Sequence, residues 1–187
     1  MNVQEKFDVI VVGGGHAGVE AAYAAAKMGS KTLLLTLDLD KIASMPCNPS
    51  VGGLGKGHIV YEVSALGGLM PKLCTTTYLQ ARMLNTSKGP AVQGLRLQID
   101  KYAYSVQAKK ELLATPNLTI ISDMTMSVTF EDTENSRKIT GVIGKDGVHY
   151  QAPSVVVTTG TFMKGLVHVG RTRYKAGRRG EAASYGL

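Results

Sequence analysis

The sequence predicts an α/β fold, a Rossmann-like parallel sheet with a small antiparallel β-meander inserted beside it. Three observations support this fold class. The β-branched residues 9–12 stop at three glycines and are followed by alanine-rich helical sequence, which gives strand, turn and helix in succession. A second apolar stretch at residues 31–35 completes a βαβ unit. Residues 117–121 and 154–161 later supply two more strand-like segments, the first of them directly after a helical segment.

The glycines after the first strand fit the G-x-G-x-x-G pattern of dinucleotide-binding turns. We expect Gly13 to turn the chain, Gly15 to let the backbone approach a pyrophosphate, and Gly18 to let the helix pack on the strand. The pyrophosphate would lie at the helix N-terminus, where unpaired N–H groups and the helix dipole favour an anion. A purely structural glycine-rich turn is the alternative. Thr36 occupies the place of the acidic residue that usually holds the ribose, and Asp38 follows slightly later.

Composition limits the class of protein. Hydrophobic residues make up 44% of the chain and charged residues 19%, which is enough for one sizeable core and leads us to expect one domain. Two cysteines are too few for a disulfide framework or a four-cysteine metal site, so we expect no metal. The first strand begins after six residues, which leaves no room for a signal peptide, and no apolar run approaches membrane-spanning length. We therefore expect a cytoplasmic protein.

Residues 36–57 are expected to form a long loop without regular structure. Two prolines flank Cys47 in this segment, and glycines crowd its second half. Long loops inside compact α/β units are usually functional or disordered. A P-loop is rejected because Gly57 follows Lys56 where serine or threonine is required. The glycines either pack the loop tightly on a helix or form a backbone surface shaped around a flat cofactor.

Two helices are expected on either side of an irregular stretch. The first spans residues 58–66 and ends at two glycines, with an apolar face made of Ile59, Val63 and Leu66. Residues 75–94 show no sustained period and are expected to be irregular. The second helix spans residues 98–113 and is amphipathic, with lysines outside an apolar face made of Ile99, Ala103, Val106 and Leu113.

Antiparallel structure is expected in the second half of the chain. Residues 125–131 alternate and residues 138–144 are strand-like, with a hairpin tip between them. An Asp-Gly turn then precedes residues 148–150, which predicts a β-meander over about 125–151. A last buried strand at 154–161 contains Gly160 near its end, where the backbone can approach a ligand. The tail, residues 164–187, is rich in glycine and basic residues and has too little apolar sequence for a core element of its own.

Five blocks of sequence are more specific than the glycine pattern. They are GGGHAGVEAA, MPCNPSVGGLGKGH, EVSALGGLM, LNTSKGPAV and VVVTTGTF. In order and spacing they resemble the N-terminal part of the GidA/MnmG proteins, a family of FAD-dependent tRNA uridine 5-carboxymethylaminomethyl modification enzymes. Family members are several times longer than 187 residues. The resemblance therefore implies that residues 1–187 are the N-terminal part of an FAD-binding domain, which is incomplete without the sequence that follows in the family.

The resemblance also implies an activity, cofactors and partners. With a GTPase similar to MnmE, such enzymes use reduced FAD, NADH and methylene-tetrahydrofolate to place an aminomethyl-type group on C5 of the wobble uridine of certain tRNAs. A homodimer is implied for the complete protein. Thr125 and Ser184 align with residues that touch FAD, and Thr36 fits a family whose second strand also lacks the usual acid. With the glycine turn and the end of the last strand, the cofactor candidates are Gly13, Gly14, Gly15, His16, Ala17, Gly18, Thr125, Gly160 and Ser184.

Cys47 is the candidate catalytic residue. By resemblance it aligns with a cysteine proposed near the flavin, and chemistry at C5 of uridine commonly needs a thiolate that adds at C6. A structural free cysteine in a proline-fixed loop is the alternative. Cys74 is expected to be buried and to have a packing role. His16 either contacts the cofactor or fills space at the start of the helix.

The basic tail is a candidate for contact with tRNA phosphates. The net charge of the chain is +7, and lysine and arginine become more frequent toward the end. Each neutralised phosphate would add salt-dependent affinity, although a basic stretch can equally be a solvated face. The residues concerned are Arg171, Arg173, Lys175, Arg178 and Arg179.

Two other functions stay open at this level. One is an ordinary nicotinamide- or flavin-dependent oxidoreductase that acts on a small metabolite, because a fold does not determine a function. The other is a non-catalytic nucleotide-binding fragment. The loop at residues 45–58 favours the tRNA-modifying class, since a general dehydrogenase has no need of it.

Overall fold

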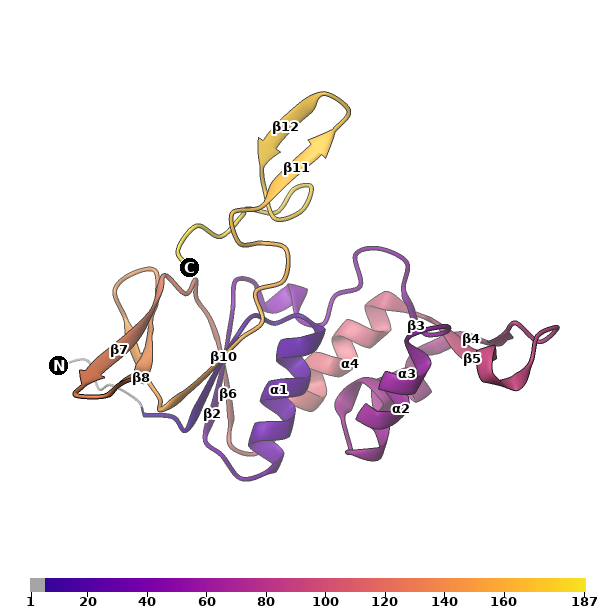
Figure 1. The fold of residues 1–187 in the computed structure, drawn as a ribbon, viewed down its shortest axis with the longest axis horizontal. Helices are drawn as coiled ribbons and strands as arrows, with labels where there is room; N and C mark the ends of the chain where they lie inside the picture. The colour runs from indigo at the N-terminus through magenta and orange to yellow at the C-terminus, as the bar shows by residue number, and fades with distance from the viewer. Residues whose placement is uncertain (1–5) are drawn as a thin grey trace. The chain divides into compact units, whose positions relative to one another are not determined.

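The contacts of the chain divide it into two compact units. The computed structural model describes residues 6–187, and Figure 1 shows their path from indigo to yellow. Unit 1 contains the chain up to Asp40 together with Thr115–Leu187, and unit 2 contains Lys41–Ala114. Residue contacts are concentrated within each of these two units.

Unit 1 is built on a four-stranded parallel sheet. Its strands, in spatial order, are β10 (Ser154–Val157), β1 (Val9–Val12), β2 (Thr32–Thr36) and β6 (Leu118–Ser122). β1 pairs with β2 on one side and with β10 on the other, without a break in register. Ile10 and Leu33 are fully buried, as the uninterrupted apolar sequence of β1 and β2 predicted. The Rossmann-like α/β class and its four strands are thus confirmed.

The direction in which strands are added to the sheet reverses beside β1. From β1 the chain moves to β2 and, after unit 2, to β6 on the same side. It then returns to place β10 on the opposite side of β1. In open α/β sheets ligands bind outside the carboxyl ends of the strands at such a switch point. The topology therefore directs attention to the residues that follow β1 and β10.

The last strand of the parallel sheet, β10, differs from its predicted extent and burial. A buried strand was predicted over residues 154–161, but the strand ends at Val157 and is one of the two edge strands of the described sheet. Val156 and Val157 are exposed among the described residues. A run of valines fits a covered strand and an edge strand alike, so the sequence could not show how much of this strand is covered.

Helix α1 (His16–Lys27) and a β-meander accompany the parallel sheet. α1 buries one side, at Gly18, Val19, Ala22, Tyr23 and Ala26. The predicted meander is confirmed as β7 (Ser127–Thr133), β8 (Ser136–Ile143) and β9 (His149–Gln151), all antiparallel. Its first hairpin tip is shorter than expected, and its second turn follows the Asp-Gly signal, with the Gly144 N–H donating to the Val148 carbonyl at 2.8 Å.

One apolar cluster joins the meander to the parallel sheet. Its buried members are Phe7, Ile10, Val12, Leu33, Leu35, Val142 and Ala152. Val142 belongs to β8, whereas Ile10 and Leu33 belong to the central strands of the parallel sheet. Burial of such side chains contributes about 1.5–3 kcal/mol each. The meander is therefore packed into the core of unit 1.

The tail forms a hairpin. β11 (Leu166–Val169) and β12 (Thr172–Lys175) pair antiparallel in a two-stranded sheet, drawn in yellow in Figure 1. The sequence of the tail showed few apolar residues, and the hairpin contributes no member to the buried apolar cluster of unit 1. Its strands are largely exposed.

Unit 2 contains three α-helices and a small antiparallel sheet. The helices are α2 (Gly57–Ala65), α3 (Leu69–Thr77) and α4 (Lys101–Leu113). The sheet has the order β3-β5-β4, with β3 (Ser50–Gly52), β5 (Gly94–Ile99) and β4 (Tyr78–Leu84). Short 3-10 turns occur as η1 (Leu39–Lys41, in the connection between the units) and η2 (Pro90–Val92).

Two expectations for this region are wrong. Residues 75–94 were expected to be irregular, but α3 ends there and β4 lies within the segment. β4 is exposed along nearly its whole length, so its sequence has no burial-driven alternation that would reveal a strand. The loop at 36–57 was expected to lack regular structure, yet it contains η1 and β3. Both are three residues long, too short to give a periodic signal.

The predicted apolar faces of α2 and α4 are also wrong. Leu66, which directly follows α2, is 88% exposed, and Gly57 is the one buried residue of α2 among those described. On α4 Val106 is 69% exposed, and the buried side is Tyr104, Ala108 and Leu112. Asp100 caps α4, because its Oδ1 accepts from the Tyr102 and Ala103 N–H groups at 3.0 Å. The helix therefore begins at residue 101, and Ile99 belongs to β5.

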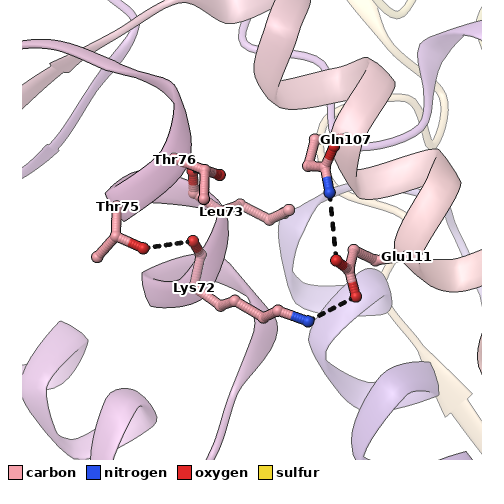
Figure 2. A network of polar contacts seen from close by, with 6 residues as sticks. All are labelled: Lys72, Leu73, Thr75, Thr76, Gln107 and Glu111. Carbon is pink, nitrogen blue, oxygen red and sulfur yellow. Dashed lines mark hydrogen bonds and ion pairs between the residues drawn. The ribbon is translucent and has the colours of Figure 1, made fainter.

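A polar network fastens α3 to α4 (Figure 2). The Lys72 Nζ lies 2.7 Å from the Glu111 Oε2, and the Gln107 Nε2 donates to the Glu111 Oε1 at 3.2 Å. The hydrogen bond from Lys72 is the main cause that lowers the pKa of Glu111. The pair is partly exposed, so it contributes at most about 1 kcal/mol. Leu73 of α3 is buried and is drawn beside this network in the same view.

Candidate functional site

The glycine turn follows β1 at the switch point of the sheet. Gly13 has a φ of +109°, and its N–H donates to the Leu35 carbonyl at 2.8 Å. A Cβ on Gly13 would lie 2.5 Å from the Thr158 carbonyl oxygen, and a Cβ on Gly18 would overlap the Gly13 carbonyl oxygen. The predicted roles of these two glycines, turning the chain and allowing close packing, are thus confirmed.

Gly15 differs from its two neighbours in the pattern. Its φ of −74° and ψ of −178° are open to any residue, and a Cβ would meet no atom of the described chain within 4 Å. Neither the backbone nor the packing of the described residues therefore requires glycine here. Its small size keeps a space open in front of α1, which fits the predicted approach of a pyrophosphate.

The N-terminus of α1 lies beside this space. Gly15 is the N-cap, and the first helical bond runs from the Val19 N–H to the Gly15 carbonyl at 2.9 Å. Among residues 6–187 no side chain caps the helix, and its first turn carries no acidic residue. An anion is the natural partner of such a helix end, because N–H groups and the positive end of the dipole point toward it. The residues present therefore fit a pyrophosphate.

Thr158 was missed by the sequence analysis and holds the turn in place. Its N–H and its Oγ1 each donate to the Val12 carbonyl at 2.8 Å, and the Oγ1 lies 3.2 Å from the Gly13 carbonyl oxygen. A Cβ on Gly18 would also lie 2.6 Å from this hydroxyl. Thr158 thus connects the end of β10 to the end of β1. A polar residue directly after a valine run was the available signal.

Gly160 and His16 complete the surroundings of the turn. Gly160, two residues beyond Thr158, has a φ of +61°, and a Cβ there would meet no described atom within 4 Å. His16 is partly buried, and burial lowers the pKa of its imidazole, with a smaller opposing effect from Glu20. The ring is therefore neutral at pH 7. It adds no charge to the site, so attraction for an anion comes from the backbone.

Thr125 and Ser184 also lie in unit 1. Thr125 is 4% exposed, and its Oγ1 is buried without a hydrogen-bond partner in the part of the chain that the structure describes. Such an atom costs about 1–3 kcal/mol unless something bonds to it, so it is a fitting contact for a ligand. Ser184 is buried, and its N–H donates to the Phe162 carbonyl at 2.8 Å. Gly186 brings this segment onto Thr125, since a Cβ there would lie 2.7 Å from the Thr125 carbonyl oxygen.

Asp123 fixes the segment that leads to Thr125, and the sequence analysis did not single it out. Its Oδ1 accepts from the Met124 N–H at 2.7 Å and the Lys145 N–H at 3.1 Å. Its Oδ2 accepts from the Tyr150 hydroxyl at 3.0 Å. Burial and this hydrogen bond raise the pKa of Tyr150 to about 12. The acidic residue directly after β6, at the carboxyl edge of the sheet, was the signal.

The two cysteines lie in unit 2. Cys47 is exposed and Cys74 is buried, so the expected packing role of Cys74 is confirmed. Within the described residues no group of three or more His, Cys, Asp and Glu side chains is placed to hold a metal ion. None of the described helices is long and apolar enough to cross a membrane.

The basic residues of the tail differ in their surroundings. The Arg178 Nη2 lies 3.1 Å from the Glu181 Oε2, and its guanidinium lies 5.0 Å from the centre of the Phe162 ring. The Lys175 Nζ lies 5.5 Å from the centre of the Tyr185 ring. The structure exposes Arg171, Arg173, Lys175 and Arg179. Arg178 is therefore engaged within the tail, whereas most of the others face solvent.

The parallel sheet and the glycine turn at its switch point define a Rossmann-like α/β protein with a candidate dinucleotide site. The family model "Glucose inhibited division protein A" matches residues 8–187. The chain therefore belongs to the GidA family.

Two similar proteins illustrate this membership, and a third shares only the fold. The chain is 52% identical to the tRNA uridine 5-carboxymethylaminomethyl modification enzyme MnmG of Syntrophobacter fumaroxidans, over 97% of this chain and 28% of that protein. It superimposes on Aquifex aeolicus GidA with a TM-score of 0.92 and 45% identity, over all of this chain and 30% of that one. A probable FAD-dependent monooxygenase of Pseudomonas aeruginosa, pqsL, shares the fold alone, with a TM-score of 0.60 and 16% identity over 84% of this chain and 43% of that one. The chain thus spans about 30% of the length of its family relatives.

Proposed function

We propose that this chain is the N-terminal part of the FAD-binding region of an enzyme that modifies the wobble uridine of tRNA. Membership of the GidA family supports the activity, because a relative that is 52% identical is named for it. The observation that carries the cofactor assignment is the open space at Gly15 in front of an uncapped helix at the switch point. The group added at C5 is the aminomethyl type, which leads to carboxymethylaminomethyluridine.

The candidate residues have distinct parts in holding FAD. The N-terminus of α1 binds the pyrophosphate, with Gly15 and Ala17 exposed beside it. Thr125 supplies its buried hydroxyl as a hydrogen-bonding group, and Asp123 holds the Thr125 segment in place. Thr158 fixes the turn from the side of β10. When bound, FAD supplies the redox chemistry, which these side chains do not provide.

Cys47 is the residue proposed to act on the uridine. Its thiolate adds to C6, which makes C5 nucleophilic toward the carbon donor; loss of the C5 proton and departure of the thiolate then restore the ring. Its exposure suits attack on a base that is part of a large substrate, and Cys74 is buried and excluded on the same ground. A structural role for Cys47 is the alternative that a mutation must test.

The remaining components belong to the same proposal. NADH serves as the reductant and methylene-tetrahydrofolate as the carbon donor. An MnmE-like GTPase is the partner, and the complete protein is a homodimer in the cytoplasm. The resemblance described in the sequence analysis is the support for these components, and about 70% of the relatives' length lies outside the part that this chain matches.

Two preparations test the proposal. A polypeptide of the relatives' length that contains this sequence should purify with bound flavin, seen by visible absorbance, and should modify unmodified tRNA, measured by mass spectrometry of its nucleosides. The 187-residue chain should bind FAD weakly or not at all and show no turnover, since the site for the flavin ring is expected from later sequence. Tight retention of NADP without flavin would contradict the cofactor assignment. Micromolar FAD binding with turnover by the 187-residue chain would show that it is not an incomplete domain.

A further inference from the structure

The positive charge of the chain is concentrated in one segment. Six of the 21 lysines and arginines, and none of the 14 acidic residues, lie between Lys164 and Gly180. The other 15 basic residues and 14 acidic residues leave an excess of only one. Residues 164–180 therefore carry nearly all of the net charge of +7, and most of this segment is the β11–β12 hairpin.

The strand register divides the hairpin into two unlike faces. Leu166 pairs with Lys175 and His168 pairs with Arg173, so these four side chains project to one side. The alternate pairs project to the other side, and they are Val167 with Tyr174 and Val169 with Thr172. We call the first side the basic face. The second side carries no charged residue.

Neighbouring contacts decide which basic residues are available. Arg178 is held by Glu181 and by the Phe162 ring, so its charge is already balanced. Arg171 lies in the turn of the hairpin and is exposed, as is Arg173 on the basic face. Lys175 lies beside the half-exposed Tyr185, which directly follows Ser184. The basic face thus continues into the segment that carries a proposed FAD contact.

We propose that the basic face of the β11–β12 hairpin, with Arg171 in its turn, binds the phosphate backbone of RNA, and that the opposite face does not. The identity of this RNA as tRNA rests on the proposed function. Arg173 and Lys175 are two residues apart on one strand, about 7 Å, so they can contact successive phosphates. Arginine matches phosphate oxygens with paired donors, and Tyr185 offers a ring for stacking against a base. Arg178 and the uncharged opposite face of the hairpin take no part.

Two variants with the same net charge separate this proposal from general electrostatic attraction. Arg173→Gln removes one positive charge from the basic face, and Thr172→Glu adds one negative charge to the opposite face, so each lowers the net charge by one. Binding of the 187-residue chain to fluorescent unmodified tRNA is measured by anisotropy over a range of salt concentrations. We expect Arg173→Gln to weaken binding several-fold and to reduce the slope of log K against log salt by about 0.7–0.9. Thr172→Glu should leave the slope unchanged, and circular dichroism should show both variants folded.

Several results would overturn the proposal. If the two variants weakened tRNA binding equally, only the net charge of the chain would matter. If the unaltered chain did not bind tRNA, the hairpin would not be an RNA-binding surface. Binding to vesicles of anionic phospholipid in preference to tRNA would assign the hairpin to a membrane, and binding to polyglutamate in preference to tRNA would assign it to an acidic protein. A native-length protein that fails to modify tRNA, while Arg173→Gln alone weakens RNA binding, would refute the proposed function and leave this inference standing.

Discussion

Adding one methyl group at either of two glycines in the same turn should have different consequences, a loss of stability at Gly18 and a loss of flavin at Gly15. In Gly18→Ala the new Cβ would overlap the Gly13 carbonyl oxygen and lie 2.6 Å from the Thr158 Oγ1. The Gly13 backbone has little freedom to move, because its φ is +109° and its N–H is bonded to Leu35. Overpacking of this kind costs about 1–3 kcal/mol. A loss of about 2 kcal/mol would lower the Tm by about 4–8 °C in a chain of this size.

Gly15→Ala should leave stability nearly unchanged. Its backbone angles suit alanine, and the new Cβ would meet no described atom within 4 Å. The smaller entropy of the unfolded chain stabilises the variant by about 0.4–1 kcal/mol. The preference of an N-cap for glycine over alanine opposes this gain by a similar amount. The methyl group would instead occupy the space proposed for the pyrophosphate, so flavin affinity should fall, and Gly15→Val should abolish it.

The assay compares both variants in stability and in cofactor content. Urea unfolding of the 187-residue chain, followed by circular dichroism, gives the free energy of unfolding. Flavin absorbance per polypeptide in the native-length protein gives cofactor content. We expect a stability loss for Gly18→Ala and a flavin loss with normal stability for Gly15→Ala. Full flavin content in both Gly15 variants would show that no pyrophosphate approaches that position, and unchanged unfolding of Gly18→Ala would refute the packing argument.

Two other predictions concern Cys47 and Tyr150. Cys47→Ser in the native-length protein should keep flavin but lose tRNA modification, whereas undiminished modification would return Cys47 to a structural role. The folded-state pKa of Tyr150 is raised to about 12, so the fold binds more protons than the unfolded chain above pH 10. The free energy of unfolding should therefore fall between pH 10 and about 12, on top of the other titrations, and Tyr150→Phe should lack that part of the fall. Equal slopes for both proteins in urea unfolding across this range would refute the raised pKa of Tyr150 in the folded chain.

The sequence by itself determined those elements in which the residue types indicate the burial or the backbone conformation of the segment. The apolar runs of β1 and β2 predicted buried parallel strands, because each residue of such a strand meets core on both faces. The glycine spacing predicted the turn, because Gly13 adopts a positive φ and Gly18 has no room for a Cβ beside the Gly13 carbonyl. The Asp-Gly signal likewise predicted the last turn of the meander. The glycine turn of the candidate site could be predicted from the sequence for the same reason.

Tertiary structure alone decided which surfaces are covered and which distant residues meet. Val106 of α4 was expected on the apolar face, but the structure exposes Val106 and buries Leu112 instead. β4 gave no periodic signal because neither of its faces is deeply buried. Thr158 and Asp123 gained their roles when β10 returned beside β1 and the meander folded onto the end of β6. Local sequence sets the shape of an element, whereas contacts between residues far apart in the chain depend on where the whole chain brings them.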